Sequence, residues 1–435
     1  MASSSSGASN KKLPLNKSIP LGIQHVLAMF AGNITVPIII AGVFGQTPDE
    51  KIFLIQMALF VAGVATVIQT VGYKEVGSRL PIIQGTSFAF IPIMVPFKAA
   101  GLGAVFTAAF IGGIFQIFIG KILKPIRHLF PPLVTGIVVL MIGISLLKVG
   151  FMYAGGGAWL MNNKPEIFGN ANHLTVAFTV LIVAIFFNLK GKGMWSSASI
   201  LIGMIAGYIV AMALGMVNYG KIASAGWFAL PMPLQYGIDF VPGAIILMLF
   251  MAVVTTIETI GDISATTMGG DNREATDKEL SGGIMADGVG TAFGALFNAM
   301  PNTSYSQNAG LVAFTGVVSR HVGTVAGVIL ILMGLFPKLG GIIASMPESV
   351  IGGAAIIMFG LIASAGIKLI AREQMNQRNL LILGLSLSFG IGMSLLPQFV
   401  NHIPDLGISL KLLLTTGLIP AGMLAFILNA IMSKK

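Results

Sequence analysis

Residues 240–268 form an apolar stretch whose only charged side chains are Glu258 and Asp262. A helix that crosses a membrane needs about 20 mostly apolar residues, and residues 244–257 lead into the acids without any charge. An acid at the centre of a bilayer costs roughly 2.5–3.5 kcal/mol on insertion scales. Because the two acids stand four residues apart, they share one helix face and must point into protein or water. Charge placed at such a cost indicates a functional site.

The composition is that of a polytopic membrane protein. The 435 residues are 55% hydrophobic and only 9% charged, whereas soluble domains contain about 25% charged residues. The net charge of +10 does not indicate nucleic-acid binding, because the basic residues occupy short loops between apolar runs. The absence of cysteine excludes disulfides and cysteine metal sites. Residues 1–12 are polar and lack the apolar centre of a signal peptide.

The apolar runs and their punctuation predict an all-α protein with fourteen membrane spans. The first seven predicted spans cover residues 20–44, 52–72, 80–98, 101–121, 130–149, 173–189 and 194–217. The second seven cover residues 242–268, 280–299, 302–318, 321–343, 348–371, 378–396 and 413–432.

The lysines and arginines predict the orientation of these spans. With the N-terminus inside, only seven of the 25 basic residues fall in external loops: Lys51, Lys98, Lys148, Lys164, Lys221, Lys338 and Lys411. The remaining eighteen fall on the cytoplasmic side, as the positive-inside rule requires. A missed span would invert every later loop. The bias therefore supports an even number of spans and two cytoplasmic termini.

Two of the predicted spans cannot be complete apolar helices. Span 3 begins at Arg79 and span 10 at Pro301, and each has a proline, then small polar or β-favouring residues, then a short apolar run. This pattern predicts an extended segment leading into a half-helix. Such irregular backbone is tolerated at membrane depth only when it is buried in protein or lines a cavity.

The two halves of the chain also resemble each other. Gly136 is followed by Met141 and Gly143, and the same spacing recurs at Gly353, Met358 and Gly360, an offset of 217 residues. Because each half contains an odd number of spans, the second repeat enters the membrane inverted. Inverted repeats with two discontinuous helices in corresponding positions indicate a transporter with its site near the midplane.

Five sequence elements resemble motifs of the nucleobase–ascorbate transporter family, the nucleobase:cation symporters. They follow the family's order across most of the chain. The elements are Gln24-His25 in span 1, Gln84-Gly-Thr-Ser-Phe88 in span 3, Glu258-x-x-x-Asp262 in span 8, Ala286-Asp287 in span 9, and residues 307–315, which resemble the signature Q/E-N-x-G-(four residues)-T.

This resemblance implies two intertwined seven-span repeats arranged as a core domain and a gate domain. After a cytoplasmic tail of residues 1–19, the core would comprise residues 20–125 and 240–344, which are spans 1–4 and 8–11. The gate would comprise residues 126–239 and 345–435, which are spans 5–7 and 12–14. The core would slide against the gate to alternate access, and the gate would form a homodimer.

The three membrane acids are the first candidates for function. An ionised Glu258 can accept charge-assisted hydrogen bonds from a ring N–H. Asp262, one turn further on, could relay a proton or hold Glu258, because two neighbouring carboxyls resist being ionised together. The family motif makes Asp287 a coupling acid or a structural acid.

The two half-helices supply the other candidates. Gln307 offers one acceptor and two donors, which suit a planar ring edge that carries both C=O and N–H. Ser306 precedes it and is expected beside the substrate or as a helix cap, while Asn308 is expected to buttress the loop. Ser87 and Phe88 open the other half-helix, where Phe88 could offer its backbone N–H and its ring face.

The family resemblance adds two positions in span 1. Gly32 would leave room for the substrate ring. His25 lies near the cytoplasmic end of the span, where a histidine bonded between helices is as reasonable as a working one. A structural role is the alternative at each candidate position, through packing, capping or helix–helix contact.

The resemblance implies a secondary active symporter of the cytoplasmic membrane that imports a purine such as xanthine or urate with protons rather than sodium. Gln307 favours the purine branch, because pyrimidine members tend to carry an acid there. A uracil permease of the same family and an anion transporter of the same fold remain alternatives. No zinc motif or complete intramembrane aspartyl motif indicates an enzyme. We expect neither a metal nor a cofactor.

Overall fold

The computed structural model of the chain describes residues 9–122, 131–401, 403 and 408–432. Residues 1–8 of the predicted tail, the predicted domain boundary between residues 125 and 126, and the C-terminal lysines lie outside the described residues. Every described element is helical apart from two short strands.

The first half of the chain contains the described elements from α1 to α11, which include the first seven predicted spans, with short helices at Gly157–Asn163 and Gly220–Ser224 in two predicted loops. In order they are α1 (Leu15–Val43), α2 (Pro48–Val71), β1 (Gln84–Thr86), η1 (Phe88–Phe90), α3 (Ile91–Met94), η2 (Val95–Ala100), α4 (Gly101–Lys121), α6 (Pro132–Ala154), α7 (Gly157–Asn163), α8 (Ala171–Lys190), α9 (Met194–Ser197), α10 (Ser199–Ala213) and α11 (Gly220–Ser224).

The second half includes the other seven predicted spans, with a short helix at Gln398–Asn401 in a predicted loop. Its elements are α12 (Pro242–Asp271), α13 (Asp277–Leu296), β2 (Asn302–Ser304), α14 (Ser306–Thr315), α15 (Arg320–Gly334), α16 (Pro337–Ala344), α17 (Glu348–Ile370), α18 (Gln377–Leu395), α19 (Gln398–Asn401), α20 (Ile408–Thr415) and α21 (Leu418–Ile431).

Span lengths differ between the prediction and the structure. In the described part of the chain, eight helical stretches are long and apolar enough to cross a membrane, and the bent pair α15–α16 makes a ninth. Of the remaining predicted spans, span 9 is a continuous but less apolar helix, Asp277–Leu296, and the others are broken or short elements. The helix α1 already begins at Leu15, so the predicted tail includes its first turn. The last predicted span is divided between α20 and α21 at Gly417, which has a φ of 70°.

The predicted extended segments of spans 3 and 10 are the two strands, and they pair with each other. The antiparallel register joins Gln84 to Ser304, Gly85 to Thr303 and Thr86 to Asn302. Two further bonds extend the pairing, from Ser87 N–H to the Pro301 carbonyl and from Tyr305 N–H to the Ile83 carbonyl. The backbone groups of these buried strands are therefore largely paired within the protein, as membrane depth requires.

Flanking threonines repeat one hydrogen-bonding pattern on both strands. The Gln84 N–H donates to Thr66 Oγ1 at 2.9 Å, and Thr66 belongs to α2. The Asn302 N–H donates to Thr291 Oγ1 at 3.1 Å, and Thr291 belongs to α13. Since α2 and α13 hold the second predicted span of each half, the two contacts are equivalent under the inverted repeat.

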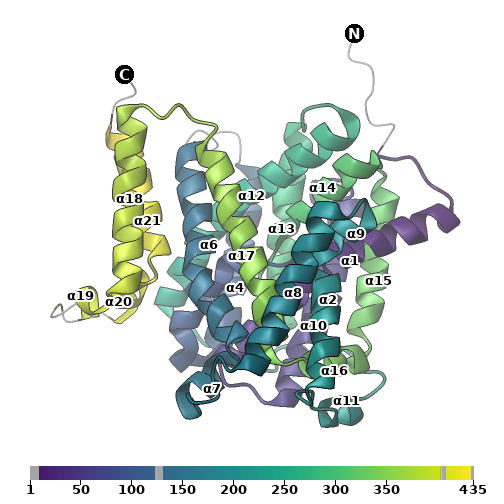
Figure 1. Cartoon of the computed structure of the whole chain (residues 1–435). Helices are drawn as coiled ribbons and strands as arrows, with labels where there is room; N and C mark the ends of the chain where they lie inside the picture. Colours follow the sequence, from purple (N-terminus) through teal and green to yellow (C-terminus); the bar gives the residue numbers. More distant parts are fainter. Residues whose placement is uncertain (1–8, 123–130, 402, 404–407, 433–435) are drawn as a thin grey trace.

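Helix packing has the same symmetry. The helix α2 packs on α15, and α13 packs on α4. The first contact joins predicted spans 2 and 11 and the second joins spans 9 and 4, so the inverted repeat converts one contact into the other. Similarly, α8 packs on α10, and α18 packs on α21. The first contact joins predicted spans 6 and 7, and the second joins spans 13 and 14, their counterparts in the second half. The packing is consistent with the predicted inverted repeat. Figure 1 shows the α18–α21 pair at the side of the molecule, next to α6.

The glycines of the repeated motif allow close packing between α6 and α17. A Cβ atom on Gly143 would lie 2.5 Å from the Ala363 nitrogen, and one on Gly136 would lie 2.8 Å from the Ile370 nitrogen. Later positions of α6 thus meet earlier positions of α17, so the two helices run antiparallel. Small residues at such interfaces let helix backbones approach each other in membranes.

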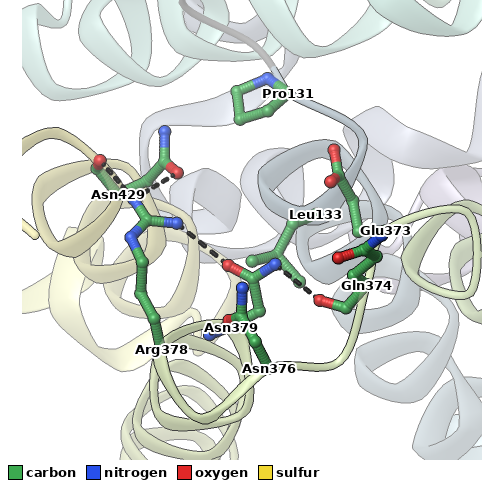
Figure 2. A pocket seen from close by; sticks show the side chains of 8 residues that line it. All are labelled: Pro131, Leu133, Glu373, Gln374, Asn376, Arg378, Asn379 and Asn429. Atoms are coloured by element: carbon green, nitrogen blue, oxygen red, sulfur yellow. Dashed lines mark hydrogen bonds between the residues drawn. The ribbon is translucent and has the colours of Figure 1, made fainter. Parts of the chain in front are cut away.

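The C-terminal helix pair is held together by Arg378 at the start of α18 (Figure 2). Its guanidinium donates to the carbonyls of Met432 at 3.0 Å and Asn429 at 2.7 Å. These carbonyls lie at the end of α21, where a helix terminus leaves acceptors unpaired and favours positive charge. A polar cavity of about 230 Å³ lies here, but none of the predicted site residues lines it.

Substitution of Gly143 by alanine should destabilise the fold. The added methyl group meets the backbone of α17, and overpacking of this kind costs about 1–3 kcal/mol. The change should lower the midpoint of thermal unfolding of the purified protein. Gly360→Ala is the matched control, because its Cβ would meet nothing within 4 Å and alanine favours a helix by up to about 1 kcal/mol. Equal midpoints for the two variants would contradict close packing at Gly143.

Candidate functional site

The ends of the paired strands open into a cavity of about 290 Å³. Its walls come from both halves of the chain. Described lining residues are Thr86, Ser87, Phe88 and Ala89 at and after the end of the first strand, Thr303 to Gln307 at and after the end of the second, Val254 and Glu258 of α12, Val139 and Ile142 of α6, and Met358, Leu361, Ile362 and Ala365 of α17. Five of the predicted substrate residues, Glu258, Gln307, Ser306, Phe88 and Ser87, thus lie around one cavity.

The two half-helices begin beside this cavity. The helix α14 follows Tyr305, and no described side chain caps its first turn. Gln307 and Ser306 are exposed and line the cavity. Neither side chain caps α14. On the opposite strand, Ser87 Oγ accepts from the Ala89 N–H at 3.3 Å and caps η1. The uncapped start of α14 leaves backbone donors available for a ligand.

Glu258 and Asp262 face the protein interior from α12, as their spacing predicts. Asp262 is buried, and its Oδ1 accepts from Ser306 Oγ at 2.6 Å. Its Oδ2 is buried without a partner among the described residues. Glu258 lines the cavity, and no described residue donates a hydrogen bond to its carboxylate. The Glu258 carboxylate is therefore available to a ligand, while Asp262 is joined to the start of α14.

Asp287 does not line the cavity. It is fully buried in α13 and accepts hydrogen bonds from Gln84 Nε2, Thr259 Oγ1 and, at 3.4 Å, Ser304 Oγ. Its three partners belong to β1, α12 and β2, so one carboxyl group joins both strands and α12 to α13. Thr259 directly follows Glu258 in α12. The contact with Thr259 therefore links Asp287 to the residue next to Glu258, the acid that lines the cavity.

The sequence analysis missed Asn33, which holds the first strand in place. Its Oδ1 accepts from the Thr86 N–H, and its backbone carbonyl accepts from Thr86 Oγ1, both at 2.8 Å. The carbonyl is free because Pro37, four residues later in α1, has no N–H to donate. A polar residue followed by proline at this spacing inside an apolar span is the signal that could have identified it.

His25 and Asn308 form a contact between α1 and α14 outside the cavity. The amide of Asn308 donates to the His25 carbonyl at 2.9 Å and lies 3.0 Å from His25 Nδ1. Because this amide nitrogen is only a donor, Nδ1 accepts and the neutral ring carries its proton on Nε2. The two residues buttress the start of α14, which agrees with the supporting role expected of Asn308.

Gly32 contacts the site indirectly. A Cβ atom there would lie 2.8 Å from Cε1 of Tyr305, whose hydroxyl donates to the Thr86 carbonyl at 2.7 Å. Tyr305 lines the cavity. The glycine therefore makes room for this tyrosine, and Tyr305 is another residue that the sequence analysis did not single out.

The wall opposite the acids is apolar. It consists of side chains from α6 and α17, including Ile142, Met358 and Ile362. The Phe88 ring also meets Phe359 of α17 edge-on, with ring centres 5.5 Å apart. Among the described lining residues none is lysine, arginine or histidine. The cavity combines one carboxylate, one amide and an apolar wall, which suits a flat, neutral ring with polar edges.

The sequence profile described as "Permease family" matches residues 16–399. The xanthine permease of Escherichia coli (strain K12) is 35% identical over 432 residues, covering 96% of this chain and 92% of that protein. The uric acid transporter of the same organism is 35% identical over 422 residues, covering 95% of this chain and 85% of that protein. The chain belongs to the nucleobase–ascorbate transporter family.

The fold is shared with an anion transporter of distant sequence. The transmembrane domain of a cyanobacterial bicarbonate transporter has a TM-score of 0.59 and 15% sequence identity, covering 97% of this chain and 100% of that domain. At this identity the likeness establishes the architecture alone. This member of the nucleobase–ascorbate transporter family is therefore a multi-pass membrane protein with a transporter fold.

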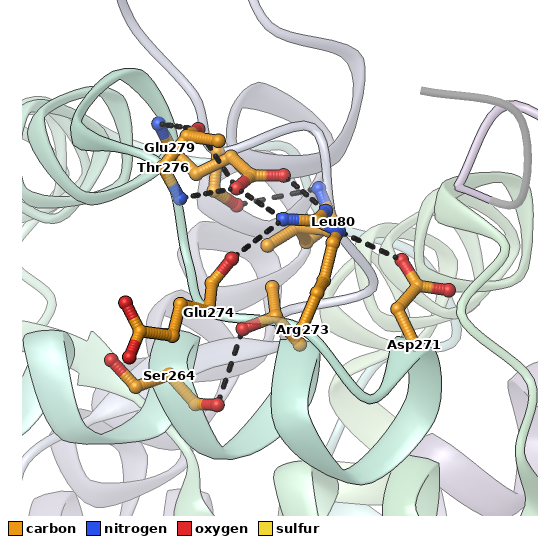
Figure 3. Close-up of polar contacts among 9 residues, drawn as sticks. Leu80, Ser264, Asp271, Arg273, Glu274, Thr276 and Glu279 are labelled. Atoms are coloured by element: carbon orange, nitrogen blue, oxygen red, sulfur yellow. Dashed lines mark hydrogen bonds and ion pairs between the residues drawn. The ribbon is translucent and has the colours of Figure 1, made fainter. Parts of the chain in front are cut away.

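A compact turn fixes the angle between the two acid-bearing helices of this family member (Figure 3). Arg273 donates to both carboxylate oxygens of Glu279, at 2.6 and 2.8 Å, and to Asp271 at 3.3 Å. Glu279 also completes a capping box with Thr276 at the start of α13. Burial acts to raise the pKa of Glu279, but the hydrogen bonds from Arg273 and Thr276 outweigh it and hold the pKa below its usual value.

Substitution Glu279→Gln should make this turn less sensitive to acid. A carboxyl whose pKa is lower in the folded state stabilises that state above its unfolded pKa, near 4.5, and loses this contribution as the pH falls through the folded pKa. The variant should unfold at a lower temperature at neutral pH, with the gap closing below about pH 4. Thermal unfolding between pH 7 and 3 measures this. Glu274→Gln is the control, and parallel curves for wild type and Glu279→Gln would contradict the argument.

Proposed function

We propose that this protein is a proton symporter that imports a purine nucleobase, xanthine or urate, across the cytoplasmic membrane. The carrying observation is that one cavity of about 290 Å³ is lined by both the Gln307 amide and the Glu258 carboxylate, to which no described residue donates a hydrogen bond. Glu258 accepts from a ring N–H, and Gln307 pairs with an edge that carries C=O and N–H. The names of the xanthine and uric acid relatives support a purine as the substrate.

The position of the cavity supports alternating access. One wall belongs to the proposed core, residues 20–125 and 240–344, and the apolar wall to the proposed gate, residues 126–239 and 345–435. Sliding of the core past the apolar wall would carry the bound ring between the two sides of the membrane. Both termini lie in the cytoplasm in this proposal, and the gate mediates a homodimer.

Proton coupling follows from the three acids. Glu258 and Asp262 lie one helical turn apart, and Asp287 is bonded to Thr259 between them. Carboxyls this close in a low-dielectric site disfavour simultaneous ionisation, so at least one holds a proton that binding and release of the base can shift. We propose protons rather than sodium for this reason.

An anion as substrate is disfavoured despite the shared fold. A site for bicarbonate or sulfate needs compensating positive charge, whereas the described lining of this cavity contains a carboxylate and no basic residue. A uracil permease would differ from a purine permease more subtly, because the two substrates differ in the size and hydrogen-bond pattern of the ring. Competition of labelled xanthine uptake by urate, hypoxanthine, guanine and uracil distinguishes the purine from the pyrimidine reading.

Substitution Glu258→Gln should abolish xanthine uptake while the protein stays folded and in the membrane. The amide keeps the size of the side chain but weakens the acceptor and removes the titratable proton. Initial uptake into vesicles or cells measures the effect, and thermal unfolding of the purified variant checks the fold. Glu166→Gln is a matched control, since Glu166 is exposed and far along the chain from the cavity residues. Uptake at the wild-type rate by Glu258→Gln would refute the assignment.

Substitution Gln307→Glu should lower xanthine uptake and move its optimum to lower pH. The change places a second carboxyl beside Glu258 at a neutral ring, so binding requires one extra proton. A gain of uracil uptake is also expected, because the acid imitates the pyrimidine branch. Initial rates with xanthine and uracil between pH 5 and 8 provide the measurement. An unchanged rate and pH profile for xanthine would show that Gln307 does not contact the substrate.

A further inference from the structure

The connection between α10 and α12, residues 214–241, does not have the composition of a loop in water. Its 28 residues include two charged ones, Lys221 and Asp239, whereas the same length of a soluble domain would contain about seven. Both neighbours of the connection are membrane-spanning elements. It must therefore lie at one face of the membrane.

The second half of this connection, residues 226–240, exposes seven large apolar side chains. Trp227 is 73% exposed and Phe240 is 69% exposed. The others are Phe228, Leu230, Met232, Leu234 and Ile238. On a soluble protein such a density of exposed apolar groups would mark a binding surface.

The backbone of the 226–240 segment is fastened to the protein, so its side chains are held outward. The Ala229 N–H donates to the Leu335 carbonyl at 3.1 Å, and the Leu234 N–H donates to the Leu296 carbonyl at 2.9 Å. Near its end, the Asp239 N–H donates to Thr107 Oγ1 at 3.0 Å. These partners lie at the ends of α15 and α13 and near the start of α4, which the segment crosses in turn.

The start of the segment combines an aromatic ring with a cation. Lys338 Nζ lies 5.5 Å from the centre of the Trp227 ring and donates to the Ala225 carbonyl at 2.9 Å. Tryptophan is enriched at the boundary between lipid chains and headgroups, and lysine extends its charge towards that boundary.

We infer that residues 226–240 lie within the headgroup–acyl boundary of this membrane face, with lipid covering their apolar side chains. Segments of this kind sink about 5–10 Å into the boundary, which requires their backbone polar groups to be paired with the protein. The hydrogen bonds to α15, α13 and α4 contribute to this pairing at three backbone N–H groups of the segment. The segment thereby ties the ends of three helices to one depth in the membrane.

Fluorescence of a single tryptophan tests this inference. Trp159→Phe combined with Trp195→Phe leaves Trp227 alone among the three tryptophans. The full-length protein is placed in phosphatidylcholine vesicles whose acyl chains are brominated either near the headgroup or near the chain ends. Iodide in the buffer serves as the aqueous quencher.

Trp227 should lose most of its emission to lipid brominated near the headgroup, less to lipid brominated near the chain ends, and little to iodide. The control replaces all three tryptophans by phenylalanine and adds Glu166→Trp, at an exposed position in the polar loop before α8, where iodide should quench strongly. Phe240→Trp in the same tryptophan-free background repeats the lipid test at the other end of the segment.

Two outcomes would overturn the inference. Iodide quenching equal to that of the Glu166→Trp control, without quenching by either brominated lipid, would place the segment in water. Quenching by neither agent would mean that protein covers the segment, including a second copy of this chain.

Discussion

The pairing of β1 with β2 is the interaction on which the rest of this protein depends. Extended backbone at membrane depth exposes N–H and C=O groups that lipid cannot satisfy. Here each broken span supplies the partner of the other. Thr66, Thr291 and Asn33 then pair groups that the two-stranded ladder leaves open. The ends of the strands, with their half-helices, can therefore face a cavity while little backbone is left unpaired.

The inverted repeat explains why this solution forms at all. In an antiparallel pair of strands, the first residue of one strand lies opposite the last residue of the other. Two inverted copies of one span are arranged in the same way. The equivalent roles of Thr66 and Thr291 follow from this symmetry, as does the repetition of α2–α15 packing by α13–α4. The side chains of the cavity do not follow the symmetry of the inverted repeat. The acids Glu258 and Asp262 occur only in the second repeat, on α12, whereas the apolar wall of the cavity comes from both repeats, through α6 and α17.

Polar groups around the site divide into those that face the cavity and those that hold its walls. Glu258 and Gln307 face it, whereas Asp287, Asn308 and His25 are bonded to protein. Asp262 lies between these groups, with one oxygen bonded to Ser306 and the other without a described partner. A network that is bonded at its edge and open at its centre fits the proposed proton coupling, because its open carboxylate is not needed to hold the strands in place.

The sequence by itself determined the class of fold, the positions of the spans and the two broken segments, because apolar length and proline placement are local properties. It also brought the cavity residues Glu258 and Gln307 into view, since an acid or amide inside an apolar run is conspicuous, and it brought Phe88 into view through the family resemblance of its segment. Their roles in binding stay predictions. Only the tertiary structure decided that the broken spans pair with each other, that Asp287 is bonded within the walls, and that Gly32 makes room for Tyr305. The sequence also did not reveal the contact of Asn33 with Thr86 or the apolar wall from α6 and α17. These features depend on contacts between segments that are distant in the sequence, which the residue types alone do not specify.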